Sequence, residues 1–161
     1  MSSKRPLRVL LVLIVVFAAD PHAQRGQRFA QDALRRAKSL SCVFSVMATA
    51  SWKNGEAVAE TKTAKLSLEF DTIEAQEGSA RYAGGDRNVA ANEIVARLSG
   101  GGLHLMQTTD SGAVYMTSVH PSESRGGKLK AVHTRHEYTE VSLPGYTSRP
   151  EQYYGECDAK P

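Results

Sequence analysis

The chain has 161 residues, of which 20 are lysine or arginine and 17 are aspartate or glutamate, so its formal net charge is +3. This length is enough for one domain with one core. Lys4, Arg5, Arg8 and Asp20 all precede residue 24, so the remainder of the chain is close to neutral. Nucleic-acid binding depends on a concentrated basic patch, and we therefore expect no nucleic-acid partner.

Residues 1–23 have the three-part layout of a secretory signal peptide. A positively charged start is followed by an apolar run of 11 residues, Val9–Ala19, and then by small and polar residues. The run is shorter than the roughly 20 apolar residues that a membrane-spanning helix needs. We expect cleavage after Ala23, export to the periplasm or the medium, and no transmembrane segment in the mature chain. The alternative is an uncleaved membrane anchor.

Residues 24–40 contain the one convincing helical pattern of the chain. Within Arg25–Leu40, apolar side chains recur near helical spacing and polar or basic side chains occupy the other positions. The apolar stripe is thin and rich in alanine, with Phe29 as its one aromatic member. This predicts a short helix that lies on the domain, or a frayed and flexible N-terminus.

Residues 41–161 are predicted to form a single all-β domain. From Cys42 onward apolar residues alternate, so Phe44, Val46 and Ala48 are expected to share an inward face. Asn54-Gly55 then predicts a tight hairpin turn. The later strands are predicted at Ala57–Thr63, Leu66–Phe70, Ala80–Ala83, Ile94–Leu98, Leu103–Thr109, Ala113–His120, Lys128–Tyr138 and Gln152–Cys157. About eight short strands separated by turns predict an antiparallel β-barrel or β-sandwich.

The cysteines Cys42 and Cys157 lie in the first and last of these strands. In an exported protein the expected outcome is one disulfide between them. A bridge between the first and last strands favours a closed sheet, because closure removes two exposed edges. The alternative is a pair of buried free thiols.

The most charged predicted strand, Lys128–Tyr138, holds the candidate site for a ligand or partner: His133, Arg135 and His136. Residues three apart on a strand face opposite sides, so His133 and His136 cannot bind one metal ion, and no metal site is predicted. Residues two apart share a face, so His133 and Arg135 together could hold an anionic group. The alternative is a charged, solvated face with an inward histidine bonded to backbone.

Motifs for catalysis are absent from the sequence. There is no Gly-x-Ser-x-Gly sequence, and the thiol that cysteine catalysis needs is expected in the disulfide. We therefore predict no catalytic residue and no cofactor. An enzyme is the least favoured of the functional hypotheses. Aromatic side chains that could line a cavity or a binding face, or simply pack in the core, are Trp52, Tyr82, Tyr115, Tyr138, Tyr146, Tyr153 and Tyr154.

The segments Leu40-Ser41-Cys42, Thr134-Arg135-His136 and Gln152–Cys157 together resemble a group of uncharacterised exported bacterial proteins. This resemblance covers the whole mature domain and implies export, an all-β domain and a bacterial source.

A second resemblance is local. The five residues Gly78-Ser79-Ala80-Arg81-Tyr82 are similar to the Ser-Gly-x-x-Tyr loop of periplasmic β-barrel inhibitors of C-type lysozyme, with glycine and serine in the reverse order. In that family the loop serine enters the lysozyme cleft. The resemblance makes Ser79 and Tyr82 candidate partner-binding residues.

The function favoured by these observations is a non-enzymatic binding or protein-interaction module of the cell envelope. The alternative is a small-molecule-binding barrel, which requires a cavity of at least about 300 Å³. A filled interior with an exposed apolar or aromatic patch instead favours a protein partner.

Overall fold

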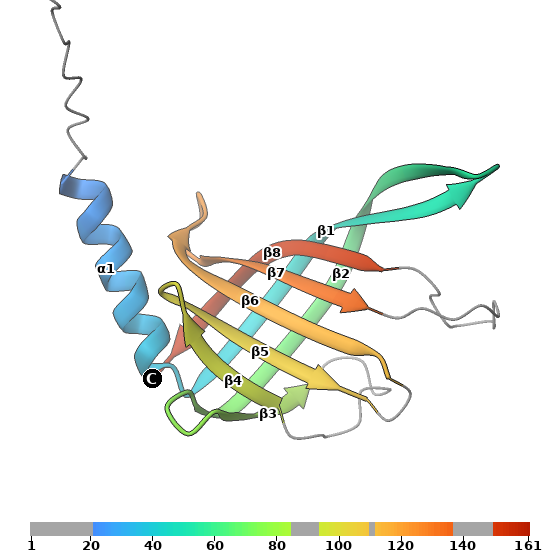
Figure 1. The fold of residues 1–161 in the computed structure, drawn as a ribbon. Helices are drawn as coiled ribbons and strands as arrows, with labels where there is room; N and C mark the ends of the chain where they lie inside the picture. Colours follow the sequence, from blue (N-terminus) through green and yellow to red (C-terminus); the bar gives the residue numbers. More distant parts are fainter. Residues whose placement is uncertain (1–20, 85–93, 110–111, 137–149) are drawn as a thin grey trace, which may run out of the picture.

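A computed structural model describes residues 21–84, 94–109, 112–136 and 150–161. It shows a closed antiparallel β-barrel of eight strands, in which each strand pairs with the next along the chain and β8 pairs with β1 (Figure 1). The predicted all-β fold is therefore confirmed, and the choice between barrel and sandwich is resolved as a barrel.

One helix and eight strands make up the described chain. Their bounds are α1 (Pro21–Arg36), β1 (Ser39–Lys53), β2 (Glu56–Glu74), β3 (Ser79–Gly84), β4 (Ile94–Ser99), β5 (Gly102–Thr108), β6 (Val114–Glu123), β7 (Leu129–His136) and β8 (Glu151–Lys160).

The hairpin of β1 and β2 projects beyond the rest of the barrel at the end away from α1 (Figure 1). Its turn is the predicted one, because Asn54 and Gly55 both have positive φ, at 53° and 84°. The two strands that the sequence predicts after this turn are one continuous strand of 19 residues. Its second half bends where Thr72 has a φ of 50°, and there its register with β3 shifts.

A β-bulge in β1 changes which side chains point into the barrel. Relative to β8, β1 has one extra residue between Phe44 and Val46. Phe44 is fully buried as predicted, but Val46 is 43% exposed, and Thr49 is buried instead. The prediction that Phe44 and Val46 share an inward face is therefore wrong. Gly155 lies opposite the bulge, where a Cβ atom would collide with the backbone of β1.

The helix α1 lies against one end of the barrel, which we call the helix end (Figure 1). Ala30 and Leu34 join the barrel core, and both are buried, whereas Phe29 points away and is 63% exposed. The middle of the predicted helix is thus correct. It ends at Arg36, however, because the chain turns into β1, and Leu40 belongs to that strand.

Cys42 and Cys157 form a disulfide and are direct cross-strand partners in β1 and β8. The bond is fully buried near the helix end and closes a sequence separation of 115 residues. The chain-entropy model assigns a loop of this length a stabilisation of about 4–5 kcal/mol. The predicted first-to-last-strand disulfide is confirmed.

The later strands differ from prediction mainly at their ends. β6 continues through Pro121 to Glu123, where a loop was expected, and β8 extends past Cys157 to Lys160. The predicted end of β7 at Tyr138 lies outside the described residues. Within the described ranges, no helix has the length and apolar character that crossing a membrane requires.

Candidate binding site in the barrel

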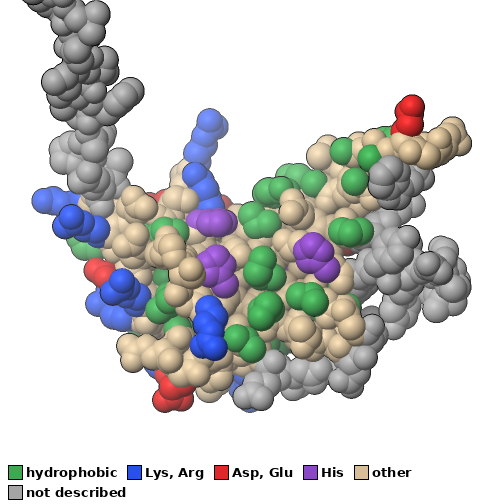
Figure 2. Space-filling view, in the orientation of Figure 1, with side chains coloured by type: hydrophobic (Ala, Val, Ile, Leu, Met, Phe, Trp, Pro, Cys, Tyr) green, Lys and Arg blue, Asp and Glu red, His purple; other side chains and the backbone are tan. Residues whose placement is uncertain are grey.

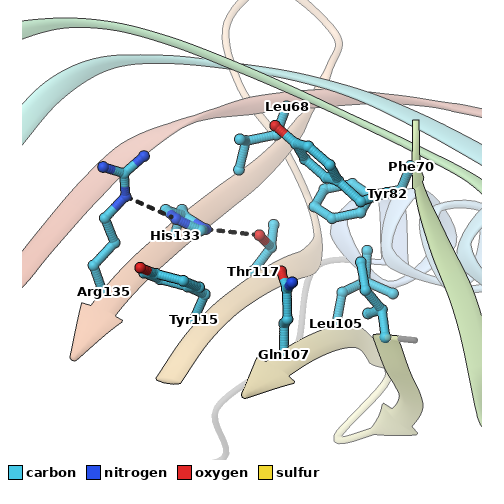
Figure 3. A pocket seen from close by; sticks show the side chains of 10 residues that line it. Leu68, Phe70, Tyr82, Leu105, Gln107, Tyr115, Thr117, His133 and Arg135 are labelled. Atoms are coloured by element: carbon cyan, nitrogen blue, oxygen red, sulfur yellow. Dashed lines mark hydrogen bonds between the residues drawn. The ribbon is translucent and has the colours of Figure 1, made fainter. Parts of the chain in front are cut away.

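The inward side chains of β5, β6 and β7 become polar at the end of the barrel away from α1, which we call the arginine end. Leu105 is followed inward by Gln107, and Leu129 and Ala131 are followed by His133 and Arg135. The alternation of the strands therefore places a histidine and an arginine on the same inner surface. Figure 3 shows them beside the side chains of β6.

His133 is 5% exposed and is held between two neighbours. Its Nδ1 lies 2.9 Å from Oγ1 of Thr117, and its Nε2 accepts a hydrogen bond from Nε of Arg135 at 3.4 Å (Figure 3). A guanidinium group can only donate, so Nε2 carries the lone pair. The proton of the neutral ring is then on Nδ1 and is donated to Thr117.

The charge state of His133 follows from its surroundings. Burial away from water disfavours the imidazolium, and the positive charge of Arg135 adds to this, so the pKa of His133 is lowered to about 3. The ring is therefore neutral at physiological pH. It acts as a fixed hydrogen-bond acceptor for Arg135 and is a poor general base.

Arg135 is half-buried and lies between aromatic rings. Its Cζ is 6.0 Å from the ring centre of Tyr115 and 5.2 Å from that of Tyr153. Tyr115 is its cross-strand partner on β6, so the ladder itself brings the two side chains together. Such cation–π contacts are worth about 0.5–2 kcal/mol each and fix the plane of the guanidinium.

Beneath these polar groups is a cavity of about 20 Å³, which is room for roughly one water molecule. It is lined by Leu68, Phe70, Tyr82, Ile94, Leu105, Gln107, Tyr115, Thr117, His133 and Arg135. Phe70 and Tyr82 pack edge-on at its wall, with ring centres 5.7 Å apart. The cavity is far below the volume expected of a barrel that encloses a drug-sized ligand.

The structure brings together some of the predicted site residues and separates the others. Tyr82, His133 and Arg135 line the same cavity. His136 is exposed on the outer surface, as alternation from His133 predicts. Tyr115, one of the aromatic candidates, also lines the cavity, whereas Tyr138 and Tyr146 lie outside the described residues.

Sequence reasoning did not single out Thr117 and Gln107, which line the cavity from β6 and β5. Their alternation with Leu105 and Val119 marks them as inward polar residues on otherwise apolar faces. That signal is present in the sequence. It becomes informative only when the register of β5, β6 and β7 is known.

Ser79 is the first residue of β3 and is half-buried, paired in register with Glu74 and Val95. Gly78 before it has a φ of 87°, which favours glycine at this turn, and the guanidinium of Arg97 lies over it. The turn therefore accounts for the Gly-Ser order. Ser79 does not line the cavity that Tyr82 lines, and the resemblance to lysozyme inhibitors stays a prediction.

Within the described ranges, no group of three or more histidine, cysteine, aspartate or glutamate side chains could hold a metal ion. His104 on β5 and His133 on β7 are instead bonded to the hydroxyls of Ser118 and Thr117 on β6, the strand between them.

A second candidate surface lies on the outside of the barrel. Apolar side chains cross the strands in register, since Val95 faces Met106 and Met106 faces Met116. Tyr154 faces Val46 on one side and Val132 on the other. We call this set the outer apolar band; its members are Val95, Met106, Met116, Val132, Tyr154 and Val46. Figure 2 shows hydrophobic side chains gathered on this face among histidines and basic residues.

Most apolar side chains of the outer apolar band are exposed to solvent. Met106 is 39% exposed, Tyr154 43% and Val46 43%. Between its two rows lie Thr134, which faces Met116, and Ser118, which faces Val132. Single exposed apolar side chains are ordinary, but a group of them on neighbouring strands marks an interaction surface.

Comparison of the chain with protein-family models, curated proteins and solved structures gives no match.

Proposed function

We propose that the chain is an exported, non-enzymatic binding module whose partner is another protein. The observation that carries this proposal is the outer apolar band on a barrel whose described interior leaves a cavity of about 20 Å³. A protein partner would cover apolar side chains that water otherwise contacts, and each square ångström so covered contributes about 25 cal/mol before the costs of association.

Export is supported by two independent features. The N-terminal residues 1–23 have the signal-peptide layout described above. The buried disulfide between Cys42 and Cys157 is typical of proteins that fold in an oxidising compartment. Together they favour the periplasm or the medium as the place where the partner is met.

The charges around the band indicate the chemistry of the partner. The strands β4 to β7 hold Arg97 and Lys130 on their exposed face, and Glu123 is their one acidic residue. His120 and His136 are also exposed on these strands, whereas His133 lies inside the barrel. A partner surface with an apolar centre and an acidic rim would complement the part of the band on β4 to β7. The strand β8, which carries Tyr154, also holds Glu156 and Asp158.

The test is capture of a partner from envelope extract by the purified mature protein and two variants. Met106→Glu with Met116→Glu puts two charges into the band, whereas Phe29→Glu puts one on the exposed side of α1 and serves as the control. We expect the wild type and the control to capture the same acidic protein, and the band variant to capture at least about tenfold less, because a buried unpaired charge is costly.

Equal capture by all three proteins would show that the band is not the interface. Sedimentation of the purified protein tests whether the band instead binds a second copy of the chain. A wild-type dimer that the band variant turns into monomers would assign the surface to a second copy of the chain and overturn the proposal of a different partner.

A further inference from the structure

Most of the N–H donors of Arg135 have no hydrogen-bond acceptor among the described residues. A guanidinium carries five N–H donors, of which the Nε–H is donated to His133. Among the described residues, no carboxylate lies within ion-pair distance of Arg135 and no other acceptor takes a hydrogen bond from it. The two terminal nitrogens therefore present the paired donors that a carboxylate accepts in parallel.

The guanidinium is also held in place before any ligand arrives. Thr117, at 2% exposure, fixes the His133 ring, and the ring in turn receives the Nε–H of Arg135. The rings of Tyr115 and Tyr153 flank the same group. An arginine whose orientation is set by its neighbours loses little side-chain freedom on binding, which favours affinity.

The charges at the arginine end favour a singly charged ligand. The site has one arginine, and His133 is neutral. Glu151, the cross-strand partner of Arg135, is buried on β8, and its Oε2 accepts a hydrogen bond from Tyr153 at 2.5 Å. Phosphate dianions are usually held by several donors or cations. A monoanion that pairs with one guanidinium fits this balance better.

The floor of the site favours a carboxylate that carries a short apolar group. Below Arg135 and His133 the cavity is bounded by Leu68, Leu105 and Ile94, and its volume of about 20 Å³ suits a group about the size of one water molecule or methyl. Figure 3 shows Arg135 and His133 on one side of the cavity and Phe70 and Leu105 on the other.

We propose that Arg135, oriented by His133 and flanked by Tyr115 and Tyr153, is the anchor of a carboxylate-binding site at the arginine end of the barrel. The carboxylate belongs to a small organic acid or to an acidic side chain of a bound protein. Both sources share the chemistry of a carboxylate next to a short apolar group. The site is separate from the outer apolar band and does not depend on it.

The test is a titration of the ¹⁵N-labelled mature protein followed by NMR. The probes are sodium propionate, inorganic phosphate, and a capped pentapeptide with one central glutamate. We expect propionate to shift the Nε–H signal of Arg135 and the backbone signals of Tyr115 and Tyr153 in a saturable way. Arg135→Lys should weaken this binding at least about tenfold, because lysine lacks the planar pair of donors. Arg125→Gln, a change at an exposed arginine in the turn between β6 and β7, is the control.

The role of His133 as a positioning residue has its own readout. His133→Gln keeps an acceptor for Arg135, and His133→Leu does not. We expect propionate affinity to be retained in the first variant and reduced in the second, with the bound-state shift of the Arg135 Nε–H lost only in the second. Equal affinities in the two variants would remove His133 from the site.

The outcomes separate the possible ligands. Tighter binding of the capped pentapeptide than of propionate assigns the site to an acidic side chain of a partner, and the reverse assigns it to a free acid. Absence of localised shifts with either probe in the wild type, or phosphate binding as tight as that of propionate, would overturn the carboxylate site. The wild-type result stands even where a variant fails to fold.

Discussion

The two ends of the barrel are built from the same strands but differ in what they bury. At the helix end, Leu34 of α1 and the Cys42–Cys157 disulfide are fully buried in a continuous apolar core. At the arginine end, the same inner surface holds His133 and Arg135. The first end contains groups whose burial is favourable in itself, whereas the second contains groups that must be bonded to one another to be buried.

The difference shows how a small barrel can place the interactions that stabilise it at one end and the polar groups proposed to bind a ligand at the other. Apolar packing and a covalent bond hold the helix end together, so the arginine end can retain a polar cluster at some cost in stability. Three changes test this comparison, in order of decreasing expected effect.

The largest effect is expected from removing the disulfide. Cys42→Ala with Cys157→Ala should lower the free energy of unfolding by about 4–5 kcal/mol, because the unfolded chain then regains the entropy of a loop of more than 100 residues. Urea unfolding of the variant and of the oxidised wild type measures it, and wild type reduced before unfolding is the control. A loss below about 1 kcal/mol would mean that the disulfide is not what holds the helix end.

The second effect concerns the helix. Leu34→Ala removes a fully buried side chain between α1 and the barrel and should lower the free energy of unfolding by about 3 kcal/mol. Phe29→Ala, on the exposed side of the same helix, is the matched control and should change it by less than about 0.5 kcal/mol. Similar values for both variants would show that α1 is not part of the folded core.

The smallest effect, when measured at pH 5, is a pH dependence at the arginine end. The pKa of His133 is about 3 in the folded protein because of burial and Arg135, and about 6.5 in the unfolded chain. Between these values the unfolded chain binds a proton that the folded protein does not. Stability should therefore fall as the pH drops below about 6.5, by about 2 kcal/mol at pH 5, and this contribution levels off below about pH 3.

Urea unfolding of the wild type and two variants across this pH range isolates the contribution. His133→Gln should remove it, and His136→Gln, a change at an exposed histidine of the same strand, should leave it in place. A wild-type profile that matches that of His133→Gln would show that His133 is protonated in the folded protein.

Local chemistry made part of this molecule predictable. Asn54-Gly55 is a turn because both residues accept positive φ, and the cysteines pair because the first and last strands are neighbours in a closed sheet. The shared face of His133 and Arg135 follows from the period of a strand. Each of these depends on residues close in sequence or on a single covalent constraint.

The remaining features depend on register between strands, which no single segment specifies. The bulge after Phe44 is defined by the pairing of β1 with its neighbours β2 and β8, and it moves Val46 from the expected core to the surface. Tyr115 meets Arg135 because β6 and β7 align at those positions, and another register would have paired Arg135 with a different side chain. The outer apolar band is likewise a property of aligned strands.

The length of β2 leaves part of this strand at an edge of the sheet, where a strand of another copy of the chain could pair with it. In the described residues, the stretch Glu56–Leu68 pairs with β1 alone, and its other edge has no strand partner. Exposed edges of this kind invite addition of a strand from a neighbouring molecule. This stretch carries Glu60, Lys62 and Lys65, and ion pairs with Lys53 and Lys62 keep Glu60 charged, with a pKa lowered to about 2. A strand added here by a second copy would have to remove these charged side chains from water, which opposes edge-to-edge pairing of the long hairpin.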